Sequence, residues 1–203
     1  DEDERGARGS GVMAGREDGG RRALAGAVVA AAVSMPRGVA IAGVEDTKKQ
    51  SPEARRVLAG KIRQQALAVG VGAASSREVD RINILRATHL AMCRAVARLC
   101  IVPQRIIVDG LPVISLGERH TAIVDGDAKV HGIACASIIA KTMRDLLMTR
   151  LSGRYPGYGW DHNVGYGTLE HRSAIDSLGM TPHHRRSFAN LKLTLDFSLD
   201  FFD

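Results

Sequence analysis

The chain has 203 residues, of which 45% are hydrophobic and 25% charged, and its formal net charge is +6 at pH 7. Its longest apolar run, LAGAVVAAAVSM, is shorter than the roughly 20 residues that cross a bilayer, and its three cysteines lack the spacing of a disulfide framework or a zinc site. We therefore expect a soluble, cytoplasmic protein with one main domain, and the positive charge favours a polyanionic partner.

The N-terminal part of the chain predicts a disordered leader followed by strands. Residues 1–11 are charged and glycine-bearing, without an apolar period. The stretches GVMAG, LAGAVVAAAVSM and GVAIAG that come next are apolar, β-branched in part and punctuated by glycine. This pattern predicts successive strands of a sheet.

The middle of the chain predicts helices separated by a short strand. Ser51 is a suitable N-cap for a helix over residues 52–67, since a proline and a glutamate follow it and the apolar spacing is helical. After the strand AVGVGAAS, Ser76 can cap a small helix. The segment NILRATHLAMCRAVARL then predicts a longer helix, with Leu85 and Met92 among the residues that face the core.

Two later apolar runs each lead into an Asp-Gly pair. RIIVDG contains Asp109, and TAIVDGDAKV continues to Asp127. We expect both runs to be buried strands that bring acids to one edge of the sheet. The following segment, GIACASIIAKTMRDLLMTRL, predicts a helix whose small residues let it pack closely on the sheet, so the order of elements is mixed α/β.

The region RYPGYGWDHNVGYGTLEH predicts a loop that leads into a helix beginning near Thr168. It contains all three tyrosines and the only tryptophan of the chain. These aromatic side chains can stack on sugars or bases, or they can pack a small subdomain. Further on, we predict His183 and His184 at the surface or in contact with nucleic acid, because adjacent histidines rarely bind one metal ion.

Acidic residues that follow three predicted strands offer a metal site. Glu17 and Asp18 follow the first, and Asp109 and Asp127 follow the two later runs. Carboxylates are the hard oxygen ligands of Mg²⁺ or Mn²⁺, and two such ions can activate a water and stabilise the leaving oxygen in phosphodiester cleavage. The alternatives are that these acids only form turns, or that the first two pair with neighbouring arginines.

The order and spacing of several motifs resemble ribonuclease HII, the type 2 ribonuclease H family, from about Val12 to Phe188. These motifs are ALAGAVVAAAV, EDTKKQSPEARR, VDRINILRATHLAM, IVDG, GDAKVHGIACASIIAKTMRD, RYPGYGW, GYGTLEH and TPHHRRSF. The resemblance implies a ribonuclease H-like α/β fold, a mixed sheet flanked by helices with a small helical C-terminal region. It implies a catalytic domain at 12–150, an aromatic and basic substrate-binding region at 151–190 and an apolar tail at 191–203.

The resemblance also implies an activity. It is that of a metal-dependent endonuclease of DNA repair, which hydrolyses the RNA strand of RNA/DNA hybrids and nicks duplex DNA at embedded ribonucleotides, leaving a 5′-phosphate and a 3′-hydroxyl. The catalytic and metal-binding acids of the family correspond to Glu17, Asp18, Asp109 and Asp127. A two-metal site for Mg²⁺ or Mn²⁺ is implied with them.

The first motif departs from the family pattern. EDGGRR stands where the family has Asp-Glu-Ala-Gly-Arg-Gly, so that the two acids are exchanged and Arg22 replaces a glycine. The exchange displaces each carboxylate by roughly 1 Å, whereas Mg²⁺ requires contacts of roughly 2.0–2.1 Å. A positive φ at Arg22 would add backbone strain. We therefore expect impaired activity, and the alternative is a homologue that binds RNA/DNA hybrids without cutting.

Substrate contacts follow from the resemblance as well. The glycine-arginine loop after the acids matches one that approaches the ribose 2′-hydroxyl, a lysine pair matches a segment near the nucleic-acid backbone, and a tyrosine in GYGT matches one that packs on the sugar beside the scissile junction. The residues at these positions are Gly20, Arg21, Arg22, Lys48, Lys49 and Tyr166. Without the resemblance, the lysine pair would be interpreted as solvated.

The C-terminal tail suggests a further partner. SLDFF, Ser198 to Phe202, resembles the short peptides that dock in the bacterial sliding clamp, and the alternative is an apolar tail packed on its own domain. We expect a monomer whose partners are RNA/DNA hybrids and ribonucleotide-containing duplex DNA, with no membrane partner.

Overall fold

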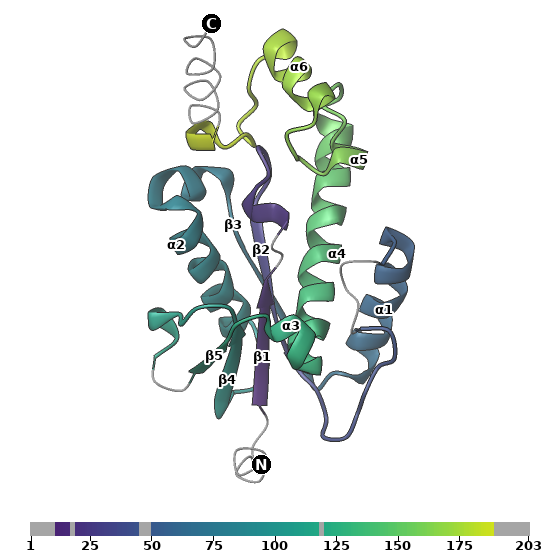
Figure 1. Ribbon diagram of the computed structural model, residues 1–203, viewed down its shortest axis with the longest axis vertical. Helices are drawn as coiled ribbons and strands as arrows, with labels where there is room; N and C mark the ends of the chain where they lie inside the picture. Colours follow the sequence, from purple (N-terminus) through teal and green to yellow (C-terminus); the bar gives the residue numbers. More distant parts are fainter. Residues whose placement is uncertain (1–10, 17–18, 45–49, 118–119, 189–203) are drawn as a thin grey trace, which may run out of the picture.

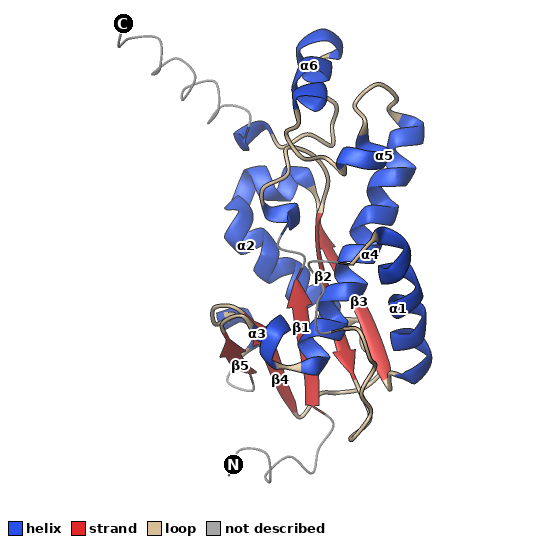
Figure 2. Ribbon diagram, turned by 45° about the vertical axis from the view of Figure 1, so that its right-hand side comes forward, coloured by secondary structure: helices blue, strands red, loops and turns tan. Residues whose placement is uncertain are grey.

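The computed structural model describes residues 11–16, 19–44, 50–117 and 120–188. In this part of the chain, five strands form a mixed sheet in the order β3-β2-β1-β4-β5, with helices on both faces (Figures 1 and 2). The strands are β1 (Gly11–Arg16), β2 (Val28–Ser34), β3 (Ala68–Ala74), β4 (Arg105–Asp109) and β5 (His120–Ile123). The predicted α/β class, a mixed sheet flanked by helices, is confirmed.

The directions of the strands determine which strand ends share an edge. β2 is antiparallel to both β1 and β3, whereas β1, β4 and β5 are parallel to one another. The carboxyl ends of β1, β4 and β5 therefore meet at one edge of the sheet. Open α/β sheets bind their ligands at such an edge, outside the carboxyl ends of the strands.

Helices cover the two faces of the sheet unequally. One face is covered by α2, and the other by the long α4 with α1 packed beside it (Figure 1). The short helices α5 and α6 lie beyond the carboxyl-terminal half of α4 and form the predicted small helical region. The helices are α1 (Pro52–Gln65), α2 (Ser76–Ala97), α3 (Gly126–Lys129), α4 (His131–Arg154), α5 (Trp160–Asn163) and α6 (Leu169–Leu178).

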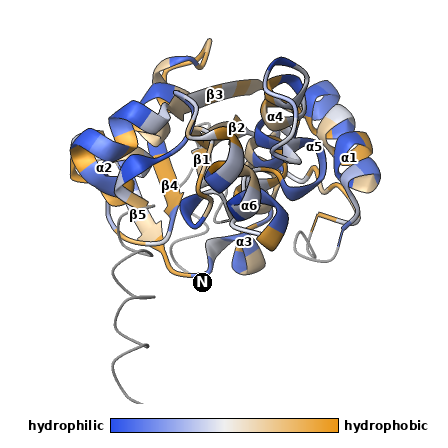
Figure 3. Cartoon of the chain, turned by 90° about the horizontal axis from the view of Figure 1, so that it is seen from above, coloured by the Kyte–Doolittle hydropathy of each residue, from blue (hydrophilic) through white to orange (hydrophobic). Residues whose placement is uncertain are grey.

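The core lies on both sides of β2, whose seven residues are all buried. Because side chains alternate across a strand, Val29, Ala31 and Val33 pack with α1 and α4, whereas Val28 and Ala30 pack with α2. Figure 3 shows hydrophilic residues on the outer turns of α2 and apolar residues on the neighbouring β4. The continuous apolar run around β2 is thus explained by burial on both faces.

A strand was predicted for the stretch GVAIAG, residues 38–43, but this stretch does not form one. Gly38 and Gly43 have φ values of +73° and +91°, which interrupt an extended backbone. The backbone N–H of Ile41 donates to Nε2 of His131 over 3.1 Å, and Ile41 and Val44 are buried in the core. The apolar residues of this segment therefore serve a buried connection, and they pair with no strand among the described residues.

The predicted helix starts are confirmed to within one residue, but one predicted core residue is wrong. Ser51 caps α1 as expected, whereas α2 is capped by Ser75 in a capping box with Glu78. Within α2, Asn83 has a φ of 65° and kinks the helix. The kink interrupts the helical period, so Leu85 is 40% exposed.

Among the described residues, no helix is long and apolar enough to cross a membrane. The predicted domain boundary between residues 150 and 151 falls inside α4, and the division into domains stays a prediction. The predicted leader, residues 1–11, lies outside the described residues except for Gly11, which begins β1, and the predicted tail, 191–203, lies outside them entirely.

Candidate active site

The parallel strands bring the predicted acids to one edge. In the β1–β4 pairing, Ala14 lies opposite Val108, so Asp109 ends β4 beside the last residues of β1. Glu17 and Asp18 follow β1 directly but lie outside the described residues. The structure therefore places the start of the acid pair's segment next to Asp109, and the positions of the two carboxylates stay a prediction.

Asp109 is a buried carboxylate held by a neighbouring turn. Its side chain lies at the end of β4, and the residue is only 4% exposed. Oδ1 accepts a hydrogen bond of 2.9 Å from the backbone N–H of Gly126. A buried carboxylate is costly unless hydrogen bonds or cations compensate its charge. An acid kept at this position is consistent with a cation-binding role.

The turn that holds Asp109 also carries Asp127. Asp127 is the second residue of α3 and is half-buried, one position after the glycine that binds Asp109. Asp125 precedes them in the left-handed region, with a φ of 55°, and its side chain is exposed. Of the two candidates in this turn, Asp127 is the more enclosed, which favours it over Asp125 as the functional acid.

Close packing of α4 against β1 fixes the strand end from behind. A Cβ at Gly15 would lie 2.6 Å from the backbone nitrogen of Ser137 and 2.9 Å from Cβ of Ala136, closer than packing allows. The close packing on the sheet that we predicted for the small residues of this helix is confirmed by these contacts, and residues 132–140 are all buried. The need for glycine two positions before Glu17 was not foreseen, because it depends on a helix more than 100 residues away.

The loop after the acid pair is held by hydrogen bonds to its backbone carbonyls. Gly20 is buried, Arg21 is half-buried and Arg22 is exposed. Arg22 is not among the described residues with a positive φ, so the strain predicted there is absent. Two buried arginines that the sequence did not reveal, Arg144 and Arg185, donate to backbone carbonyls of the segment 20–27.

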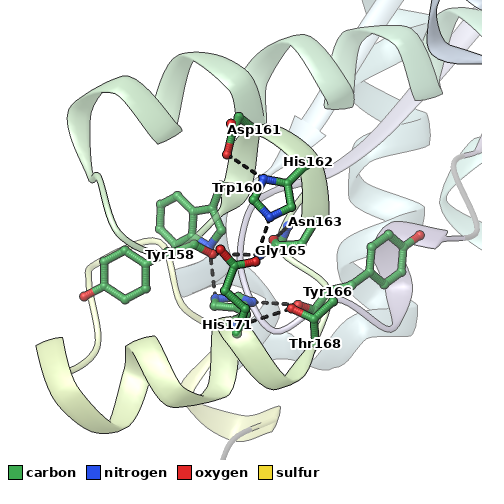
Figure 4. Close-up of polar contacts among 10 residues, drawn as sticks. Tyr158, Trp160, Asp161, His162, Asn163, Gly165, Tyr166, Thr168 and His171 are labelled. Atoms are coloured by element: carbon green, nitrogen blue, oxygen red, sulfur yellow. Dashed lines mark hydrogen bonds and ion pairs between the residues drawn. The ribbon is translucent and has the colours of Figure 1, made fainter.

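Tyr166 lies in a loop that packs against this same segment. The backbone N–H of Leu24 donates to the carbonyl of Gly165 over 2.8 Å, which joins the two loops. The carbonyl of Tyr166 accepts a bond of 2.7 Å from Nδ1 of His171, as Figure 4 shows. The structure thus joins the Tyr166 loop to the segment that follows the acid pair, and the substrate-binding roles of Tyr166 and of residues 20–22 stay a prediction.

The two histidines His171 and His184 form a buried network. Nδ1 of His184 accepts from the backbone N–H of Thr181, and Nε2 of His171 accepts from Nε1 of Trp160 over 3.0 Å (Figure 4). The two Nε2 atoms lie 3.1 Å apart. Burial lowers the pKa of His171, and it lowers the pKa of His184 to about 4, so both rings are neutral at pH 7.

This network corrects one prediction and bears on the two interpretations of the aromatic loop. His184 is 2% exposed and cannot contact nucleic acid, although its neighbour His183 is only half-buried. Tyr158 and Trp160 are also buried, with their rings stacked at a centroid distance of 5.1 Å. Two interpretations were left open for the aromatic loop, stacking on nucleic acid and packing of a small subdomain. For Tyr158 and Trp160, their burial favours packing.

The residue after the lysine pair, Gln50, is tied to the helices, although Lys48 and Lys49 themselves lie outside the described residues. Nη1 of Arg55 donates to the carbonyl of Gln50, and Nη2 of Arg55 binds Oδ2 of Asp145 over 2.9 Å. The arginine is buried between α1 and α4.

Within the described ranges no three His, Cys, Asp or Glu side chains gather into a metal-binding group, and two of the four predicted ligands fall outside those ranges.

Comparisons with known proteins agree with this architecture. The family model described as Ribonuclease HII matches residues 14–191. A Ribonuclease HII of Synechococcus sp. (strain JA-3-3Ab) is 52% identical over 89% of this chain and 82% of its own length. A Ribonuclease HII of Thiobacillus denitrificans is 49% identical over 91% of this chain and 90% of its own.

Solved structures show the same fold. The ribonuclease H2 of Pyrococcus horikoshii OT3 has a TM-score of 0.71 at 24% identity, over 87% of this chain and 93% of that one. The RNase HII of Archaeoglobus fulgidus, solved as a PCNA complex, has a TM-score of 0.69 at 25% identity, over 86% of this chain and 94% of that one. The expected ribonuclease H-like fold is confirmed. The chain belongs to the ribonuclease HII family and is an endoribonuclease.

Proposed function

We propose that this chain is a divalent-metal-dependent endonuclease that hydrolyses the RNA strand of RNA/DNA hybrids and also nicks duplex DNA at single ribonucleotides. The family accounts for the first activity. The observation that supports the site is the shared edge of β1, β4 and β5, where Asp109 and the turn of Asp127 lie beside the end of the strand that leads to Glu17. The products would be a 5′-phosphate and a 3′-hydroxyl.

The residues at this edge fit a hard cation. Asp109 is buried and offers carboxylate oxygen, Asp127 adjoins it, and Glu17 and Asp18 would complete an all-oxygen set. Such a set suits Mg²⁺ or Mn²⁺ better than Zn²⁺, which prefers nitrogen and sulfur. The structurally similar Bst-RNase HIII, at 20% identity, was solved in complex with Mn²⁺. When bound, the ions would supply an activated water and stabilise the leaving oxygen.

The chain's own groups would orient the substrate around that edge. The peptide groups at 20–22 would approach the ribose 2′-hydroxyl, and Tyr166 would pack on the adjoining sugar. Arg21, Lys48 and Lys49 would contact phosphates, which position a duplex without reading its sequence. The segment 20–27, which contains the loop at 20–22, is joined to the Tyr166 loop by the Leu24–Gly165 hydrogen bond, so the two loops would bind neighbouring nucleotides as one surface.

A nicking assay tests this function. The protein is incubated with duplex DNA that carries one ribonucleotide, with Mg²⁺, with Mn²⁺ and with chelator. We expect metal-dependent nicking by the wild type and its loss in Asp109→Asn, whereas Asp176→Asn on the exposed face of α6 should behave as wild type. Binding without nicking under all metal conditions would instead favour the alternative that this chain binds RNA/DNA hybrids without cutting them. The comparisons do not support that alternative.

The tail adds a proposed partner. The RNase HII of Archaeoglobus fulgidus was solved in a PCNA complex, which favours a sliding-clamp contact for this chain too. We propose Ser198 to Phe202, outside the described residues, as the docking segment. Deletion of Asp196 to Asp203 should abolish binding to the bacterial clamp without changing the nicking rate on short duplexes. Unchanged clamp binding would remove the segment from the proposal.

A further inference from the structure

Arg185 is a fully buried cation whose guanidinium donates to backbone carbonyls of one segment and lies over the ring of Phe188, 5.3 Å from its centroid. Its Nε and Nη2 both donate to the carbonyl of Gly26, over 3.0 and 2.8 Å, and its Nη1 donates to Gly20 and to Ala23, over 2.5 and 3.0 Å. The residue is 0% exposed, so it does not touch a nucleic acid itself. One guanidinium thus holds three carbonyls along the loop that follows the acid pair.

These bonds determine where the neighbouring N–H groups point. A trans peptide is planar and its C=O and N–H point in opposite directions. Because the carbonyl of Gly20 points at Arg185, the N–H of Arg21 is directed away from it. Because the carbonyl of Ala23 also points at Arg185, the N–H of Leu24 points away, where it donates to the carbonyl of Gly165.

The same arginine therefore links both parts of the proposed substrate surface. On one side it orients the peptide groups around Arg21, and on the other it supports the junction with the loop that carries Tyr166. The backbone N–H of Arg185 donates to the carbonyl of Leu24 over 2.8 Å, which anchors the arginine to the segment that it orients. Arg144, on α4, donates to the carbonyls of Ala25 and Ala27, whereas Arg185 donates to those of Gly20 and Ala23.

We propose that Arg185 is a positioning residue for ribonucleotide recognition. Through the carbonyls of Gly20 and Ala23 it holds the loop at 20–22 and the Tyr166 loop at the relative orientation that distinguishes a ribonucleotide from a deoxyribonucleotide in duplex DNA. This inference rests on the proposed function, because it assumes that these two loops contact the substrate. Lysine keeps the charge but lacks the planar fork that reaches separate carbonyls, so it is the appropriate substitution.

The test measures binding without cleavage. Wild type, Arg185→Lys, Arg185→Gln and the control Arg105→Lys, at the exposed start of β4, are titrated, with chelator present, against two duplexes that differ by one ribonucleotide. We expect wild type and Arg105→Lys to prefer the ribonucleotide duplex. Arg185→Lys should lose about tenfold or more of that preference, the effect of one charge-assisted hydrogen bond, while its affinity for the all-DNA duplex stays within about twofold.

The outcomes separate this inference from the proposed function. Equal weakening on both duplexes, an unchanged preference in Arg185→Lys, or no preference in wild type would each overturn the positioning role. Arg185→Gln removes the charge, and retention of the preference in this variant would overturn it as well. Nicking by wild type with Mn²⁺ is measured separately, so a protein that discriminates but does not nick refutes the proposed function and leaves the role of Arg185 supported.

Discussion

Gly126 shows how one residue without a side chain shapes the candidate site. Its N–H binds Asp109, and a Cβ at this position would lie 2.6 Å from Cδ1 of Ile133 and 3.3 Å from Oδ1 of Asp109. The turn that carries Asp127 reaches β4 only because this space is empty. The acid and the glycine therefore act as a pair, although the sequence motif draws attention to the acids alone.

Substitution of this glycine should affect the reaction more than the fold. We expect Gly126→Ala to lower the nicking rate by about tenfold to a hundredfold, since misplacement of reacting groups near 1 Å costs about that much. Overpacking should cost about 1–3 kcal/mol of unfolding free energy. Single-turnover rates and urea unfolding measure the two effects.

The control for this prediction is Gly153→Ala. Gly153 lies in α4 with no atom within 4 Å of the added Cβ, so it should raise stability by about 0.5–1 kcal/mol and leave the rate unchanged. A wild-type rate in Gly126→Ala would show that the turn does not depend on the close contact.

The reversed acid order leads to a second prediction at the residue scale. The double variant Glu17→Asp, Asp18→Glu should raise the single-turnover nicking rate by about a hundredfold with Mg²⁺, because it returns each carboxylate to the length that the family has there. Arg22 needs no change in this variant, since its backbone is unstrained. Glu53→Asp, on the exposed start of α1, serves as the control. A slower double variant would mean that the backbone here is adapted to the reversed order.

At the scale of elements, glycines set how closely α2 approaches the sheet. A Cβ at Gly72 of β3 would lie 2.1 Å from the carbonyl oxygen of Ala91, and one at Gly70 would lie 2.1 Å from that of Ala95. Backbone atoms cannot move aside as a side chain end can. The alternation of glycine in AVGVGAA is thus explained by a helix resting directly on the strand.

Gly72→Ala should therefore separate the two elements. We expect a loss of about 1–3 kcal/mol in unfolding free energy, seen as a lower Tm, with the nicking rate at 25 °C retained because the acid edge lies on other strands. Gly60→Ala on the exposed side of α1 is the matched control and should raise Tm slightly. Equal Tm values for wild type and Gly72→Ala would contradict such close packing.

The buried histidines determine how the whole molecule responds to acid. Both His171 and His184 have a lower pKa in the folded protein than in the unfolded chain, where it is about 6.5. Between that value and about 4, the unfolded state binds more protons, so stability rises with pH across this window and is lost as pH falls through it. The carbonyl of Tyr166 depends on the same ring network.

We accordingly expect unfolding free energy to fall from pH 7 to pH 5, by of the order of 2 kcal/mol, in urea titrations at each pH. His162 contributes a pH dependence of stability with the opposite sign, because Glu170 raises its pKa. This contribution is screened by solvent, since His162 lies at the surface. His162→Gln should therefore retain the slope. A flat profile from pH 7 to pH 5 would show that the buried rings accept protons without cost.

Much of the molecule followed from local sequence signals. Ser51 and Thr168 cap their helices as predicted, and the apolar runs around β2 and β4 form strands, because capping and periodicity are properties of neighbouring residues. The stretch at 38–43 failed the same logic, since its glycines adopt turns and its apolar residues fill a core built by distant helices.

The sequence by itself determined the family, the α/β class and the acids expected at the strand ends, because motifs, caps and apolar periods are written in adjacent residues. Only the tertiary structure decided which face of α4 presses on Gly15, why His184 is buried, and that Arg185 holds the loop at Gly20. These features join residues up to 165 positions apart. Their physical cause is close packing and the need of buried polar groups for partners, which no local pattern specifies.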